Sequence, residues 1–385
     1  MTRRLSASAS VFLAMLSLGI GAMHLSANPG QSRANAGQEK PQSFDQISQA
    51  ATLARKESRD DEAIRLYAQA LKLRPDWPEG LWYQGTLLYE KENFGEARDV
   101  LRRFVALDPQ AGPGWVVLGM SEYQTREYPR SLDHLQRALS LGLGDRKDLV
   151  RSAQYFEAVI LTRFERYEDS MTVLGTMQRA GETSDLLLEP MGLAALRMPL
   201  LPTEIPADRR DLVRMAGQGS LTIESEHTDE TEKMFSEMVA RYPDVPGVHF
   251  LYGVFLMDVR PDEGIRQMQR ELEISPFHLG ARLRIAEEYI KEQKFDEALH
   301  LAEEAAKLDP NNAQTHMILG ETLMGKGDAT KGVAELETAR KQSPDSVRTH
   351  WDLLRAYTST GRSADAKREK EEIERLNRLE SQQVP

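Results

Sequence analysis

Apolar segments recur along most of the chain, and each ends in a polar turn that carries a proline. Five of these ends read LKLRPD, VALDPQ, LEISPF, AKLDPN and RKQSPD, with prolines at Pro75, Pro109, Pro276, Pro310 and Pro344. Their spacing is constant, because 109 − 75, 310 − 276 and 344 − 310 each give 34 residues. A fixed period of this length predicts helix–turn–helix units stacked on copies of themselves.

Each unit also carries a small residue twelve positions before its proline. These residues are Ala63, Ala97, Thr231, Gly264, Ala298 and Gly332. Two helices approach closely only where no bulky side chain intervenes, and a proline cannot continue a helix. Few stretches alternate in the manner of a β-strand, so the pattern predicts an all-α protein.

The repeat resembles the tetratricopeptide repeat, whose pattern is W-x2-L-G-x2-Y, then A-x3-F, then P. Trp115, Leu118 and Gly119 match its first half, and Tyr67 and Phe235 fall on the aromatic position of the second helix. The repeats in register are 44–77, 78–111, 112–145, 151–184, 212–245, 246–278, 279–312, 313–346 and 347–380. The resemblance therefore implies a right-handed α-solenoid that covers nearly all of the chain after its N-terminal segment.

The departures from this register suggest how the array is organised. The stretch 185–211 contains four prolines and fits the repeat worst, so we interpret it as a kinked or broken helix followed by an extended link. It is then the joint between an N-terminal array, 44–184, and a C-terminal array, 212–380. The last segment of the second array is a highly charged helix, which is typical of the cap that ends a repeat array.

The N-terminus has the layout of a secretory signal. Arg3 and Arg4 precede an apolar run over residues 11–23, which is short for a membrane span. The small residues Ala34 and Ala36 form an A-x-A site, which predicts cleavage after residue 36. We therefore expect residues 1–36 to be a signal peptide and the mature protein to be periplasmic or otherwise extracytoplasmic.

Two alternatives remain at this end of the chain. A second cleavage site follows Ala27, although Leu25 stands where a small residue is preferred. The segment could also stay in place as an uncleaved N-terminal anchor, and we expect no other membrane span. Residues 37–43 are polar and read as a linker to the first repeat.

Charge and cysteine content exclude several classes of partner and site. The formal net charge is −11 and no local run of Lys and Arg compensates it, so nucleic acid is not an expected partner. The chain has no cysteine, which excludes a disulfide, a thiolate metal site, a cysteine nucleophile and a covalently attached c-type haem.

The chain carries no motif that predicts catalysis. It lacks H-E-x-x-H, G-x-S-x-G and the glycine-rich dinucleotide turn. The segment from Gly320 to Lys326 reproduces most of a phosphate-binding loop, but Gly327 follows where Ser or Thr would bind magnesium, and no strand precedes it. We therefore predict a protein that is not an enzyme and that uses no cofactor.

Histidine and methionine provide two further alternatives. His249, His316 and His350 stand at the fourth position of their repeats, where the family prefers Trp, and 350 − 316 = 34 places two of them a whole repeat apart. We interpret them as packing residues rather than as ligands of one metal ion. Met234 and Met238 share a helix face, which suits either copper or, as we favour, adaptable packing in the core.

The resemblance also indicates where a partner would bind, because the first helix of each repeat lines the concave surface of such arrays. On the groove positions stand aromatic residues, which are favoured anchors for a partner chain. These are Trp82, Tyr89, Tyr123, Tyr155, Phe250 and Trp351. The alternative for each is packing between neighbouring helices. Glu79, Trp82 and Thr86 do not match the basic clamp that holds a C-terminal carboxylate, so such a clamp is not expected.

Taken together, these features predict a non-enzymatic scaffold or adaptor that binds other proteins or peptides through its concave surface. An exported array of this kind suits the assembly of envelope or secretion complexes. The alternative is an accessory subunit of an envelope enzyme system, such as a protease or a polysaccharide-synthesis complex.

Overall fold

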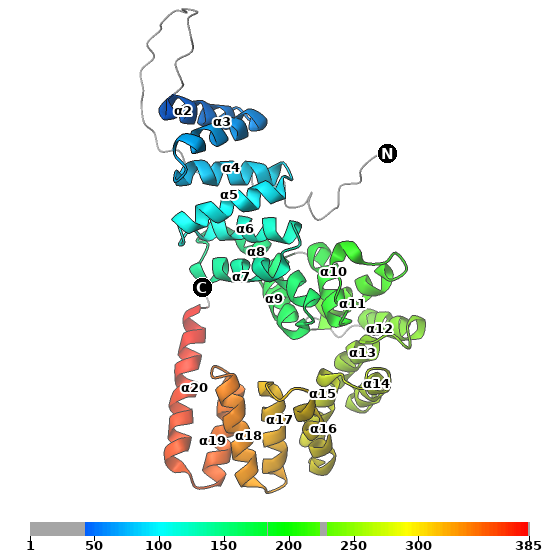
Figure 1. Cartoon of the computed structure of the whole chain (residues 1–385). Helices are drawn as coiled ribbons and strands as arrows, with labels where there is room; N and C mark the ends of the chain where they lie inside the picture. The colour runs from blue at the N-terminus through cyan, green and yellow to red at the C-terminus, as the bar shows by residue number, and fades with distance from the viewer. Residues whose placement is uncertain (1–42, 183, 224–228, 384–385) are drawn as a thin grey trace, which may run out of the picture. The chain divides into compact units, whose positions relative to one another are not determined.

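The computed structural model describes residues 43–182, 184–223 and 229–383, and nearly all regular structure in them is α-helical (Figure 1). These residues form nineteen α-helices and one short 3-10 helix, η1, with no strand among them. The all-α prediction is therefore confirmed. The signal peptide predicted over residues 1–36 lies outside the described residues.

The chain forms two compact units, which divide between Arg210 and Asp211. The first unit contains α2 (Phe44–Lys56), α3 (Asp60–Leu73), α4 (Pro78–Glu90), α5 (Phe94–Leu107), α6 (Gly112–Gln124), α7 (Tyr128–Leu141), α8 (Lys147–Arg163), α9 (Tyr167–Arg179), α10 (Ser184–Ala195) and η1 (Pro202–Glu204). The second contains α11 (Arg210–Ile223), α12 (Asp229–Arg241), α13 (Val248–Met257), α14 (Pro261–Ile274), α15 (Leu279–Lys291), α16 (Phe295–Leu308), α17 (Ala313–Gly325), α18 (Ala329–Gln342), α19 (Val347–Ser359) and α20 (Ser363–Gln383).

Within each unit, helices that follow one another in the chain pack as antiparallel pairs, for example α6 with α7 and α17 with α18 (Figure 1). The first helix of a pair needs a small residue where a side chain of the second helix lies directly against it. A Cβ atom at Gly119 would lie 2.8 Å from the Cγ of Leu135. The same contact lets the hydroxyl of Ser131 donate to the carbonyl of Gly119 at 2.7 Å. The stacked pairs form the predicted α-solenoid.

The first helices of successive repeats also contact each other directly. In the first unit α4 meets α6, α6 meets α8 and α8 meets α10, and in the second unit α15 meets α17 and α17 meets α19. Within the described residues, the second helices of successive repeats do not come as close. The first helices therefore line the inner side of the curve within each unit, and we call this side the first-helix face.

The turn inside most helix pairs contains one residue in the left-handed conformation. Five of these residues are not glycine, and their φ angles lie between 54° and 63°. They are Ser58, Glu92, Arg126, Glu165 and Gln293, and Gly327 and Gly361 occupy the same place in the last two pairs. A left-handed residue ends one helix and redirects the chain into the next, and glycine adopts this conformation with the least strain.

A ring N–H group joins several first helices to the turn that precedes them. The Nε1 of Trp115 donates to the carbonyl of Pro109 at 3.0 Å. The Nε2 atoms of three histidines make the same bond to a proline six residues earlier, at 2.9, 2.8 and 2.8 Å for His249, His316 and His350. A carbonyl only accepts, so Nε2 carries the hydrogen. Histidine therefore replaces Trp here as a flat ring with one N–H donor, and no set of three or more metal-ligating side chains gathers within the described residues.

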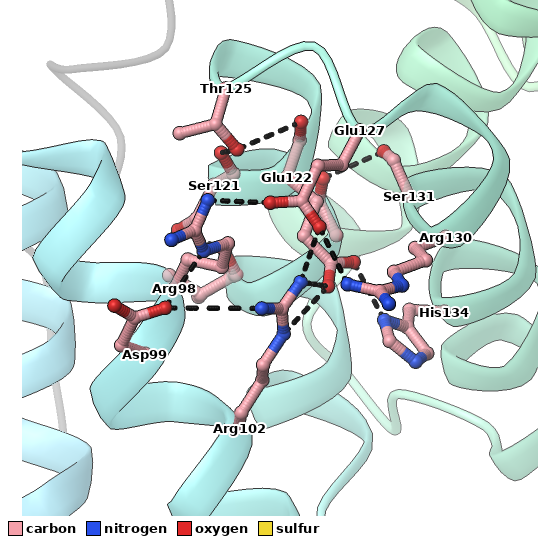
Figure 2. A network of polar contacts seen from close by, with 12 residues as sticks. Arg98, Asp99, Arg102, Ser121, Glu122, Thr125, Glu127, Arg130, Ser131 and His134 are labelled. Carbon is pink, nitrogen blue, oxygen red and sulfur yellow. Dashed lines mark hydrogen bonds and ion pairs between the residues drawn. The ribbon is translucent and has the colours of Figure 1, made fainter.

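A network of buried and half-buried charges fixes neighbouring repeats of the first unit to each other (Figure 2). Glu122 of α6 is fully buried, and its carboxylate accepts from Arg102 of α5 at 2.8 Å and lies 2.7 Å from the Nδ1 of His134 of α7. Glu127 bonds both Arg98 and Arg102 at 2.5 Å. The network joins α5 of one repeat to both helices of the next, so it holds the first-helix face in place.

Two regions depart from the regular repeat. After α7 the chain passes through Gly142 and Gly144, with φ angles of 78° and 55°, before α8 begins, and α8 is 17 residues long where α6 has 13. After α10, which contains Pro190, the chain continues through η1 to α11. Among the described residues, no helix is both long enough and apolar enough to span a membrane.

Candidate functional site

Trp82 lies on the first-helix face of the first unit, next to an open cavity of about 310 Å³. Its ring is partly buried and packs on Phe104, with the ring centroids 5.4 Å apart. The cavity is lined by Glu79, Trp82, Phe104, Ala111, Pro113, Gly114 and Arg146. The apolar lining suits an apolar side chain of a partner protein, and the two charges of opposite sign can bond polar groups of the partner's backbone.

Two of the three predicted tyrosines of this unit lie deeper than Trp82. Tyr89 and Tyr155 are each only 5% exposed, and Tyr89 packs on Phe94 at 5.2 Å between ring centroids. Tyr123 is partly buried and packs on Phe156 at 4.6 Å. Burial raises the pKa of all three hydroxyls above their usual value. Tyr89 and Tyr155 therefore offer a partner little surface, whereas Tyr123, like Trp82, is only partly buried.

At the end of α8, this face is covered by a later segment of the same chain, which includes Pro199 and Glu204. The guanidinium of Arg163, the last residue of α8, donates to the carbonyl of Pro199 at 2.7 Å and to the carboxylate of Glu204 at 3.2 Å. Leu201 and Ile205 of the same segment are each 5% exposed. The segment after α10 is therefore packed against the unit, and Arg163 is engaged within it.

The two predicted residues of the second unit differ in exposure. Phe250 of α13 packs on His278, with ring centroids 4.4 Å apart, and on the apolar cluster that includes Ile285. Trp351 of α19 is 49% exposed. Of the six predicted aromatic residues, Trp351 offers the largest exposed fraction for a partner.

Around Trp351 the first-helix face carries charges from three helices. Arg348 and Arg355 lie one turn to either side of Trp351 on α19, because residues three and four apart share a helix face. Arg348 bonds Glu287 of α15 at 2.8 Å and Glu321 of α17 at 3.3 Å. These contacts tie α19 to the first helices of the two preceding repeats.

A second open cavity of about 310 Å³ lies beside these charges. Its walls are Ile290, Glu321, Met324, Leu336, Asp352, Arg355, Ala356 and Ser359. We call Glu321 and Asp352 the carboxylate pair. The side chain of Asp352 is 2% exposed; its Oδ1 accepts from Arg355, whereas no N–H group of the described residues donates to its buried Oδ2.

Comparison with family models decides what kind of repeat this is. Two models, each described as the tetratricopeptide repeat, match residues 49–112 and residues 289–342. The chain therefore contains tetratricopeptide repeats in each of its two units.

Solved structures include similar repeat proteins, although the likeness is loose. A structure of MamA, residues 41 to the end, from Desulfovibrio magneticus RS-1 is 19% identical, with 44% of this chain and 96% of that chain covered and a TM-score of 0.37. A crystal structure of yeast Tom70 is 11% identical, with 86% and 92% of the two chains covered and a TM-score of 0.33. No curated protein matches the chain.

The carboxylate pair of this tetratricopeptide-repeat protein has unusual electrostatics. Burial raises the pKa of Glu321 to about 7, and the nearby charge of Asp352 adds to the rise. The guanidinium groups of Arg348 and Arg355 oppose it. Two carboxylates that share a half-buried site resist being charged together, and a nearby cation favours the state in which both are charged.

We expect Glu321→Gln to make the protein more stable than the parent at pH 8, with the difference shrinking towards pH 5. The folded pKa of Glu321 lies above its unfolded value, so folding retains a proton that the unfolded chain has lost, and the parent loses stability as pH rises through this window. Urea unfolding of both proteins at the two pH values measures this. A gain that is equal at both pH values would contradict the titration of Glu321.

The repeat register also predicts the charged part of this site, which a search for aromatic residues does not find. Glu287, Glu321 and Arg355 all stand at the ninth position of successive repeats, since 321 − 287 and 355 − 321 both equal 34. The family lines its groove with this position. Charged residues at that spacing would have identified the polar half of the site, whereas a search for aromatic anchors found only Trp351.

Proposed function

We propose that this tetratricopeptide-repeat protein is a scaffold that binds protein partners through the first-helix faces of its units. The observation that carries the proposal is the apolar cavity beside Trp82. A partly exposed aromatic ring on a rigid helix, with an open apolar space next to it, is the arrangement that anchors partner side chains at protein interfaces. The charges of Glu79 and Arg146 at its edge add polar contacts that orient such a partner.

The repeat architecture supports this role because the face is built from several independent helix pairs. Each pair packs mainly on its neighbours, so the surface is extended and rigid while its residues vary from repeat to repeat. An extended partner segment can then contact several first helices at once, and weak contacts add up.

We further propose that the partner belongs to an envelope or secretion assembly. This part of the proposal rests on the signal-like N-terminus, with its two arginines and its apolar run, which lies outside the described residues. Export would place the binding faces in the extracytoplasmic space.

Trp82→Ala is expected to reduce the affinity for the native partner by about thirtyfold, because the loss of an aromatic anchor commonly costs an interface about 2 kcal/mol. Affinity capture from the envelope of the native host, followed by quantitative mass spectrometry, measures the effect. Trp82 is the better choice than Tyr123, because Trp82 lines the cavity, whereas Tyr123 packs on both Phe156 and Tyr128.

The matched control is Leu73→Ala, which removes an apolar side chain that is 56% exposed at the end of the second helix α3. Circular dichroism should show equal helicity for both variants. If Trp82→Ala retains the same proteins in the same amounts as the parent, the cavity is not the binding surface.

A further inference from the structure

The cavity on the first-helix face of the second unit has a charged end and apolar walls. We infer that this cavity receives a basic side chain, arginine in the first instance, from an extended segment of a protein partner. The inference rests on the proposed function, because it takes this face to be a partner-binding surface. It goes further by naming the chemistry of the partner and the residues that recognise it.

The first argument is the unpartnered oxygen of Asp352. Asp352 lines the cavity, and no N–H group of the described residues donates to its buried Oδ2; once the neighbouring Glu321 carboxyl has lost its proton, Oδ2 has no donor. A buried acceptor without a donor is unfavourable, and proteins satisfy nearly all such atoms. A ligand that brings an N–H group into the cavity supplies the missing donor, whereas an acidic or purely apolar ligand does not.

The shape of the cavity fits a long basic side chain. Ile290, Met324, Leu336 and Ala356 provide apolar walls, and the carboxylate pair lies at the polar end. Arginine carries an aliphatic stem and a planar head with five N–H donors, so it can fill the apolar part and bond both carboxylates. The compact ammonium of lysine meets the same charge with fewer donors.

The protein's own Arg355 shows that a guanidinium can meet the pair. Its Nη2 contacts Asp352 and lies 3.7 Å from the carboxylate of Glu321. The side chain of Arg355 is nevertheless 71% exposed, so this contact is held weakly and competes with water. A partner arginine that also buries its stem displaces Arg355 and leaves it in solvent.

The surrounding charges favour a cation once Arg355 has moved. Glu287 of α15 adds a third carboxylate to the pair. Among the described residues, the other bases ion-paired with these acids are Arg348 of α19 and, on Glu287, Arg284 of α15. Three acids then stand against two bases. The neighbouring Trp351, half exposed on the same helix, offers a flat surface for the residue that flanks the arginine.

The test uses the full chain and a short fluorescent peptide with both ends capped, in which one arginine is flanked by alanine and leucine. Capping removes terminal charges, so only the side chain can supply the cation. Fluorescence anisotropy should show binding, and replacing arginine by its neutral isostere citrulline should weaken affinity by about tenfold. A lysine peptide should bind more tightly than the citrulline peptide, and a glutamate peptide should not bind.

Variants of the protein separate recognition from structure. Glu321→Gln and Asp352→Asn should each weaken binding of the arginine peptide by about tenfold, with Glu303→Gln on the second helix α16 as the control that leaves affinity unchanged. Arg355→Ala should strengthen binding by about threefold, since it removes the internal competitor. If the acids served only to hold Arg355, removing it would bring no gain in affinity.

Equal affinity for the arginine and citrulline peptides would overturn the inference, as would full affinity in Asp352→Asn. Circular dichroism of each variant shows whether a loss of binding comes from unfolding, and the gain expected from Arg355→Ala cannot arise from unfolding. The proposed function fails separately. If Trp82 is still needed for partner capture while the peptides bind equally, only the inference is lost; if the parent captures no partner at all, the proposed function is lost.

Discussion

Replacing Gly119 with leucine is expected to destabilise the third repeat by about 3 kcal/mol, which is the upper range for forcing a larger side chain into a packed interior. Even the first added atom would lie 2.8 and 2.9 Å from the side chain of Leu135 and 3.3 Å from the carbonyl of Ser131. Leu135 is fully buried, so it has no free space to move into. The two helices must therefore separate, and the hydrogen bond from Ser131 to Gly119 is lost with them.

Gly95→Leu is the matched control, because a Cβ atom at Gly95 meets nothing within 4 Å. There the same change should raise stability by about 0.5 to 1 kcal/mol, since leucine favours a helix more than glycine does. Repeat arrays open locally, so hydrogen exchange of the amides in residues 112–141 is the most direct measurement. Similar protection in both variants would show that α6 and α7 do not meet at Gly119.

Glu122→Ala should cost about 3 kcal/mol, because it leaves buried or half-buried bases without their carboxylate. Glu122 is fully buried, and its two oxygens hold Arg102 and His134 (Figure 2). The control is Arg130→Ala in the same network, where the side chain is 65% exposed and the expected change is within about 0.5 kcal/mol. Denaturant unfolding with hydrogen exchange over α5 to α7 measures both.

A second substitution tests the cause of this loss. If the cost of Glu122→Ala comes from unpaired charge, then Arg102→Met added to it should recover part of the stability, and the two changes should not be additive. If the cost comes only from the lost volume of the glutamate, Arg102→Met should add its own penalty. The double-mutant cycle therefore distinguishes an ion-pair network from simple packing.

The repeat itself could be predicted from the sequence because the prolines and small residues that define it act locally. A proline ends a helix wherever it stands, and a small residue marks a close approach whichever helix lies opposite. Pro75 and Ala63 thus report on a single helix pair, and the period of 34 residues confirms the pattern at each return. The histidines could be placed but not explained, since their bond to a proline carbonyl depends on the angle between two repeats.

The functional surface was less accessible to such reasoning, because exposure depends on groups that are distant in the chain. Tyr89 and Tyr155 stand on groove positions, yet the ring of Tyr89 packs on Phe94 of the next helix and Tyr155 is buried. Arg163 is engaged by Pro199, which is 36 residues away on a segment outside the repeat pattern. The carboxylate pair arises where α17 and α19 meet, and only the packed structure brings those two acids together.

The left-handed turn residues are sites at which substitution can raise the melting temperature of this scaffold. At Ser58, Glu92, Arg126, Glu165 and Gln293 the backbone adopts a conformation that suits glycine, and each side chain costs about 1 kcal/mol. The five turns are separate, so gains from glycine at each would add. An engineer could therefore raise the melting temperature in small, independent steps while leaving Trp82 and the carboxylate pair untouched.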